Sequence, residues 1–155
     1  MEFFGVKERA SMSKAAADML HPGEAVSKTI LVVEDDEVTG TLISEIITQE
    51  TSHTVLLARD GFRALELVKE FAARPHLFIL DYRLPGMDGI KLYDQLHAIS
   101  ELDHIPAIIL SASIEEHKDQ IQARNIIGLG KPFDTDEFLL TIEEELVDVS
   151  NYQGL

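Results

Sequence analysis

Three acidic residues of this chain follow short apolar runs: Glu34 and Asp35 follow one run, and Asp81 follows another. The runs themselves, residues 30–33 and 77–80, are typical of strands buried inside a parallel sheet. A carboxylate at the end of such a strand is costly unless it is exposed, paired or bound to a cation. Ligand sets made only of oxygen atoms favour Mg²⁺ or Ca²⁺. The pattern therefore indicates a candidate cation site, provided that the two strands are neighbours.

Acidic residues also favour the first turns of helices, and this reading has to be weighed for each of them. We interpret Asp36 and Glu37, which continue the acidic run, as acids of a helix N-terminus. For Glu34, Asp35 and Asp81 we favour the metal site, because all three are expected at strand ends.

A hydroxyl and an ammonium group follow two further apolar runs. Ser111 comes after residues 106–110, and Lys131 comes after residues 125–129 and Gly130. If all these strands are parallel, their carboxyl ends share one edge of the sheet, where open α/β sheets bind ligands. A cation site, a carboxylate nucleophile, a hydroxyl and an ammonium are the parts needed to hold a phosphoryl group on Asp81.

The spacing of the apolar residues predicts five strand–helix units. The expected strands are residues 30–33, 54–57, 77–80, 106–110 and 125–129, and the expected helices are 38–49, 60–71, 88–96, 114–124 and 134–146. Such alternation predicts an α/β fold, a doubly wound parallel sheet with helices on both faces. The flavodoxin-like strand order 2-1-3-4-5 is one of two common choices, and it makes the first and third strands neighbours.

The length of 155 residues fits a single domain. We expect an amino-terminal extension or linker over residues 1–27, the domain itself over 28–150, and a tail over 151–155. The extension shows no strand pattern, although residues 13–20 could form a short helix that Pro22 and Gly23 would end.

Composition excludes several classes of function. The chain has no Cys, so it has neither disulfides nor thiolate metal sites, and its six His show no metal-binding spacing. It shows no signal peptide and no apolar run long enough to span a bilayer, so we expect a cytoplasmic protein without membrane insertion. The formal net charge of −15 argues against direct binding of nucleic acid and favours cations or basic protein surfaces as partners.

Four motifs together resemble the receiver domains of bacterial response regulators. They are Ile30 to Asp35 (ILVVED), Asp81 to Gly89 (DYRLPGMDG), Leu110 to Ala112 (LSA) and Lys131 to Phe133 (KPF). Each motif alone is weak, but their order and their places at strand ends make the combined signal strong. The resemblance covers about residues 28–148.

The resemblance implies a role for each matching residue. Asp81 would be the phosphoacceptor, Asp35 a direct Mg²⁺ ligand, and Glu34 a ligand acting through water. Arg83 would offer its backbone carbonyl to the metal. Ser111 and Lys131 would bind the phosphoryl group, and the Lys131–Pro132 peptide bond would be cis. The implied partners are a histidine kinase or a histidine phosphotransfer protein, and a downstream protein target.

Three features depart from the pattern of the family. The aromatic residue expected two to three positions before Lys131 is missing, because Gly128 and Leu129 stand there. The interval from Ser111 to Lys131 is slightly short, and no output domain follows. We therefore expect any response to phosphorylation in residues 111–126, which have few apolar anchors, chiefly Ile114 and Ile121.

Four functions fit these observations to different degrees. We favour a stand-alone receiver that assists its own phosphorylation and dephosphorylation but is not otherwise an enzyme. The alternative is a receiver domain excised from a hybrid histidine kinase. A phosphohydrolase of the haloacid-dehalogenase type would typically carry a second Asp where Arg83 stands. A pseudo-receiver that only binds partners would not need the complete set of acids, Ser111 and Lys131.

Overall fold

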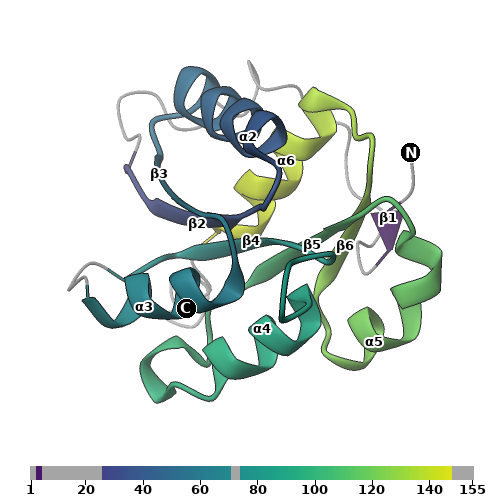
Figure 1. Cartoon of the computed structure of the whole chain (residues 1–155). Helices are drawn as coiled ribbons and strands as arrows, with labels where there is room; N and C mark the ends of the chain where they lie inside the picture. The colour runs from purple at the N-terminus through teal and green to yellow at the C-terminus, as the bar shows by residue number, and fades with distance from the viewer. Residues whose placement is uncertain (1–2, 5–25, 71–73, 148–155) are drawn as a thin grey trace, which may run out of the picture.

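The computed structural model describes residues 3–4, 26–70 and 74–147, which fold around a six-stranded sheet (Figure 1). The strands are β1 (Phe3–Phe4), β2 (Thr29–Val33), β3 (Thr54–Ala58), β4 (Leu77–Asp81), β5 (Ala107–Ser111) and β6 (Ile127–Gly130), in the spatial order β1-β6-β5-β4-β2-β3. Strands β2 to β6 are parallel and confirm the predicted order 2-1-3-4-5. The flavodoxin-like α/β fold is therefore as predicted.

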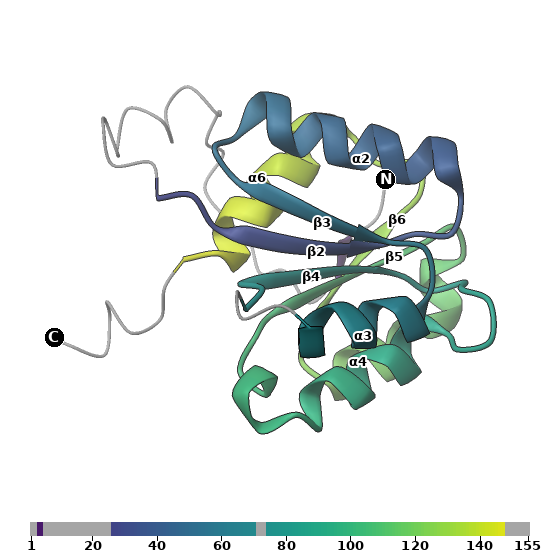
Figure 2. The same cartoon turned by 60° about the vertical axis from the view of Figure 1, so that its left-hand side comes forward.

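Helices cover both faces of the sheet. Their bounds are α2 (Glu37–Glu50), α3 (Gly61–Glu70), α4 (Gly89–His97), α5 (Lys118–Ala123) and α6 (Thr135–Glu145), with short 3₁₀ helices η1 (Ser100–Leu102) and η2 (Ile114–His117). Helices α2 and α6 lie on one face, and α3, α4 and α5 lie on the other (Figures 1 and 2). This arrangement follows from right-handed crossovers: the chain moves from β2 to the edge strand β3 and then in the opposite direction across the sheet to β4, β5 and β6, which places α3, α4 and α5 on the face opposite α2.

Each face of the sheet has its own apolar core. On the α2–α6 face, Ile30 and Val32 of β2 pack with Ile43 of α2 and Phe138 of α6. On the opposite face, residues such as Leu31 pack with the apolar sides of α3, α4 and α5. Because both faces are covered, the central strands are apolar at nearly every position, and this is the source of the runs seen in the sequence.

Aspartates begin four helices at the carboxyl edge of the sheet. The carboxylates of Asp36, Asp60, Asp88 and Asp134 accept backbone N–H groups three residues later, at 2.8, 2.7, 2.8 and 3.1 Å. These contacts satisfy amide donors that have no partner within the helix. They confirm the interpretation of Asp36, show Asp60, Asp88 and Asp134 in the same role, and place the starts of the helices beside the candidate site.

The structure corrects the sequence reading in two places. The amino-terminal extension was predicted without a strand, yet β1 pairs antiparallel with β6, with Phe3 opposite Leu129 and Phe4 opposite Gly128. The expected helix 114–124 is divided into η2 and α5, because His117 leaves the helical region at φ −110° and ψ 8°. The predicted helix 13–20 and Phe71 lie outside the described residues.

Within the ranges that the structure describes, no helix is both long and apolar enough to cross a membrane.

At the amino end of the sheet, a buried histidine connects β2, β3 and α6. His53 Nδ1 accepts the Lys28 backbone N–H at 3.1 Å, so the ring proton lies on Nε2, which donates to Glu143 Oε1 at 2.9 Å. The Lys28 ammonium also donates to the Leu146 carbonyl at 2.7 Å. These contacts hold the start of the sheet to the end of α6.

We predict that His53→Ala destabilises the fold by about 1–3 kcal/mol, because it leaves the Lys28 amide without an acceptor and opens a cavity. Urea unfolding followed by circular dichroism measures this change. His104→Ala is the matched control: the His104 side chain is 74% exposed, so its effect should stay within about 0.5 kcal/mol. Equal stabilities of the two variants would contradict the role given to His53.

Candidate functional site

The carboxyl edge of the sheet brings together the acids that the sequence singled out. Strands β2 and β4 are neighbours, with Val33 in register with Leu80, so the residues that follow them share one place on the edge. Glu34, Asp35 and Asp81 each offer a carboxylate oxygen, and these oxygens lie within 4.8 Å of one another. Glu34 and Asp81 are buried, whereas Asp35 is exposed.

Lys131 reaches across the edge from β6 to two of these acids. Its ammonium contacts Asp81 Oδ1 at 2.6 Å and Glu34 Oε1 at 2.8 Å. The Lys131–Pro132 peptide bond is cis, as the family resemblance implied. The Lys131 backbone N–H donates to the Ser111 carbonyl at 2.8 Å, which continues the pairing of β5 and β6 beyond Gly130.

The charges at this edge do not balance. Burial raises the pKa of Glu34 to about 7, and Asp81 adds to this effect while Lys131 opposes it. Burial alone would lower the pKa of Lys131, but hydrogen bonds to Asp81 and Glu34 raise it. Glu34 Oε2 is buried and has no hydrogen-bond partner among the described residues. An unpaired buried oxygen among three carboxylates fits a divalent cation with oxygen ligands.

Ser111 lies between the acids and Lys131. It is the buried last residue of β5, whose neighbour β4 ends at Asp81, in register with Leu110. Its Oγ accepts the Ser113 backbone N–H at 3.0 Å. The hydroxyl therefore belongs to the same edge and also supports the first turn of the segment that leaves it.

The loop that follows Asp81 is tightly fixed. The Tyr82 N–H donates to the Leu110 carbonyl at 2.8 Å, and the Tyr82 carbonyl accepts the Gly89 N–H at 2.8 Å. A Cβ atom at Gly89 would overlap the Asp81 carbonyl oxygen, so the close approach requires glycine. The Arg83 side chain is exposed.

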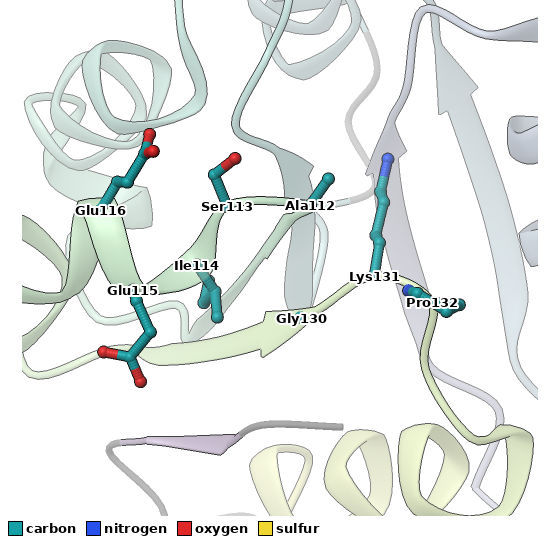
Figure 3. Close-up of a pocket in the computed structure, with 8 residues that line it drawn as sticks. All are labelled: Ala112, Ser113, Ile114, Glu115, Glu116, Gly130, Lys131 and Pro132. Carbon is teal, nitrogen blue, oxygen red and sulfur yellow. The ribbon is translucent and has the colours of Figure 1, made fainter.

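Sequence reasoning missed two features beside the site. The Tyr82 and His117 rings stack with their centroids 3.5 Å apart. A pocket of about 440 Å³ also opens between residues 112–116 and 130–132 (Figure 3). Both depend on where the segment after β5 lies relative to its neighbours, and no local pattern in the sequence reports this.

Comparisons with known proteins agree with this geometry. The family model for the response regulator receiver domain matches residues 30–143. Sporulation initiation phosphotransferase F of Bacillus subtilis is 34% identical over 130 residues, which are 81% of this chain and 99% of the relative. The polar-differentiation response regulator DivK of Brucella anthropi is 29% identical and covers 78% of this chain and 98% of its own length.

A solved structure of a receiver domain is similar as well. The receiver domain of a sensor histidine kinase from Pseudomonas aeruginosa, with a magnesium ion coordinated in its active-site cleft, is 25% identical with a TM-score of 0.69. The alignment covers 79% of this chain and all of that domain.

The family model spans most of the chain, a relative above 30% identity matches over nearly its full length, and the motifs occupy the strand ends that the fold requires. This chain belongs to the family of response regulator receiver domains.

Proposed function

We propose that this chain is the phosphoacceptor of a two-component or phosphorelay system, with Asp81 as the residue that is phosphorylated. In the transfer, the P–N bond of a phosphohistidine breaks and a P–O bond to an Asp81 oxygen forms, while the imidazole leaving group takes up a proton. The observation that carries this proposal is the pairing of the buried Asp81 carboxylate with the Lys131 ammonium at 2.6 Å beside two further acids.

Each neighbouring residue has a part in this proposal. Lys131 would neutralise charge on the phosphoryl oxygens, which is the main task of a protein in phosphoryl transfer. Ser111 would donate its hydroxyl to one of those oxygens by a charge-assisted hydrogen bond. Burial of Asp81 excludes bulk water and strengthens both interactions.

Mg²⁺ is the proposed cation. Glu34, Asp35, Asp81 and the Arg83 backbone carbonyl would hold it, with Glu34 acting through water. When bound, it would neutralise charge shared by the phosphoryl group and the acids. Support comes from the cluster of carboxylates, the unpaired Glu34 Oε2 and the magnesium ion in the related receiver domain.

Exposed apolar side chains near the site favour a protein as the phosphoryl donor. Val38 and Leu42 of α2 are 75% and 54% exposed, and Phe62 at the start of α3 is 57% exposed. Val38 lies three positions after Asp35, and Phe62 lies against Gly86 of the loop after β4. An apolar helix of a histidine kinase or phosphotransfer protein could pack on these residues and bring its phosphohistidine to Asp81.

The first candidate for the whole protein is a stand-alone receiver that passes the signal to a downstream protein in the cytoplasm. The near-complete coverage of a sporulation phosphotransferase of similar length supports it. The alternative, a receiver domain of a hybrid histidine kinase, is supported by the match to a kinase receiver domain. We propose no separate substrate and no direct nucleic-acid partner, since the protein carries a formal net charge of −15.

We predict that acetyl phosphate with Mg²⁺ adds one phosphoryl group to the wild type and none to Asp81→Asn, because the amide cannot act as the nucleophile. Intact-mass spectrometry measures the added mass. Asp103→Asn, which neutralises an exposed aspartate (63% exposed side chain), should be labelled like the wild type. Labelling of Asp81→Asn to the same extent would place the phosphoryl group on another residue.

We predict that Asp35→Ala abolishes the shift of the thermal midpoint caused by Mg²⁺, because the cation loses a direct ligand. Binding by the wild type should be weak, since Mg²⁺ keeps several waters at such sites. Asp36→Ala is the control: Asp36 caps α2, so this variant should unfold at a lower temperature but keep its response to Mg²⁺. An unchanged response in Asp35→Ala would place the metal elsewhere.

We predict that, with EDTA present, wild-type stability falls as the pH rises from about 5 to 8. Glu34 has its pKa raised to about 7, so the folded state binds more protons than the unfolded state in this window. Stability from this group is thus lost as Glu34 ionises. Glu34→Gln should flatten the slope, measured as thermal midpoint against pH, and an identical slope would contradict this account.

A further inference from the structure

An aromatic contact joins the residue after Asp81 to the segment after Ser111. The Tyr82 and His117 rings are nearly parallel, at 13°, with centroids 3.5 Å apart. Both side chains are half-buried. Stacked aromatic pairs contribute stability beyond the area that they bury. The stack therefore connects the loop after the proposed phosphorylation site to the segment that follows Ser111.

Tyr82 is the fixed side of this contact. Its backbone is hydrogen-bonded to Leu110 of β5 and to Gly89 of α4, both at 2.8 Å. Gly89 packs so closely against the Asp81–Tyr82 backbone that no side chain would fit. We therefore expect a change in the stack to come from a movement of the segment that carries His117, since the Tyr82 backbone is fixed.

Helix α5 is held firmly at its carboxyl end. Arg124 forms a two-pronged contact with both carboxylate oxygens of Asp94 on α4, each at 2.8 Å. Asn125 has a positive φ of 56°, and the Ile126 N–H donates to the Ile121 carbonyl at 3.3 Å. Together with the Asn125 N–H to Gln122 carbonyl bond, this is a Schellman arrangement that ends the helix firmly.

The amino end of α5 has weaker attachments. His117 occupies the cap position with φ −110° and ψ 8°, and its side chain makes no capping hydrogen bond. Between Ser111 and Ile121, Ile114 is the one buried residue. Two contacts with Tyr82 attach this part of the helix: the ring stack on His117 and the hydrogen bond that the Tyr82 hydroxyl donates to Gln120 Oε1 at 3.5 Å.

A phosphoryl group on Asp81 would act on this end through Ser111. The Ser111 Oγ accepts the Ser113 N–H at 3.0 Å, and the Ser113 carbonyl accepts the Glu116 N–H at 3.0 Å in η2. When the hydroxyl turns to the phosphoryl oxygens, this support of η2 changes. On the neighbouring strand, Gly128 offers no side chain that could carry the movement instead.

We propose that the Tyr82–His117 stack is a latch: it holds α5 in place when Asp81 is free and opens when a phosphoryl group engages Ser111. This proposal rests on the proposed function of Asp81. After opening, α5 pivots about the end held by Arg124 and Asp94. Residues 113–116 then move against residues 130–132, and the pocket between them changes shape (Figure 3). A partner protein that binds at this pocket can thereby distinguish phosphorylated from unphosphorylated Asp81.

Nuclear magnetic resonance of the histidine rings tests the latch directly. In the metal-free wild type, ring protons of His117 should be shifted upfield relative to Tyr82→Leu, because they lie over the Tyr82 ring. Beryllofluoride with Mg²⁺, a mimic of the phosphoryl group, should move them to the position seen in Tyr82→Leu. His97, whose ring is tilted by 33° against Tyr93 with centroids 3.9 Å apart, is the internal control, and its signals should not move.

Two outcomes of this experiment overturn the latch. One is a His117 signal that is the same in the wild type and in Tyr82→Leu, which would mean that the rings do not stack. The other is a His117 signal that keeps its upfield shift while the amide signals of residues 111–113 respond to beryllofluoride. A response in Asp81→Asn equal to that of the wild type, or none in the wild type, would instead refute the proposed function.

Hydrogen exchange tests the latch independently of Asp81. In His117→Ala without any phosphoryl mimic, amides of residues 116–121 should exchange several-fold faster, whereas those of residues 124–126 should keep their protection. His104→Ala, which removes an exposed histidine, should change neither group. Unchanged exchange in residues 116–121 of His117→Ala would overturn the latch, even if Asp81 proved not to be phosphorylated.

Affinity for the phosphoryl mimic provides a third measurement. If the closed latch disfavours the state with a phosphoryl group on Asp81, thermodynamic coupling requires that opening the latch favours binding of the mimic. Loss of one aromatic stack should therefore tighten the binding of beryllofluoride with Mg²⁺ to His117→Ala by about two- to tenfold. His104→Ala should bind it with wild-type affinity. An unchanged or weaker affinity in His117→Ala, with Asp81 labelled normally by acetyl phosphate, would overturn the latch and leave the proposed function intact.

Discussion

The ammonium of Lys131 is the contact on which the functional edge of this molecule depends. It approaches both buried acids, Asp81 at 2.6 Å and Glu34 at 2.8 Å, and no apolar packing could replace that compensation. Burial raises the pKa of Glu34 to about 7, and the neighbouring Asp81 adds to this effect, so one ammonium does not fully compensate the two buried carboxylates. The fold thus keeps a local excess of negative charge that a cation can relieve.

The excess of negative charge exists because the backbone fixes Glu34, Asp35 and Asp81 at neighbouring strand ends. Parallel pairing of β2 with β4, and of β5 with β6, fixes where each strand ends. The two apolar cores hold the strands from both faces, and the aspartate caps fix the helices that follow. The edge is therefore well fixed on the β2 and β4 side. The segment after β5 has few buried residues, and it is the part that the proposed latch would move.

Most of the fold was predictable from the sequence. Doubly covered strands must be apolar along their whole length, so the five parallel strands stand out as runs, and the polar residues that follow them identify the edge. The aspartate cap of α2 was also predictable, because a short acidic side chain just before a helical pattern commonly caps the helix N-terminus. The expected strand order alone brings Glu34, Asp35 and Asp81 together.

The missed features depend on contacts between distant segments. Strand β1 has only two residues, and its pairing with Gly128 and Leu129 leaves no periodic signal in the sequence. The break in the helix occurs at His117, whose ring stacks on Tyr82, a residue 35 positions earlier in the chain. Local propensity cannot report either, because both are set by tertiary packing.

Strand β1 also has a consequence for how copies of the molecule behave toward one another. An unpaired strand at the border of a sheet offers its backbone to any other chain, and this is a common route to aggregation. In the described part of the chain, β1 lies along the outer side of β6 and covers part of that border, as Figure 1 shows. A version without β1 would leave Gly128 and Leu129 without this partner strand, so solubility at high concentration depends on Phe3 and Phe4.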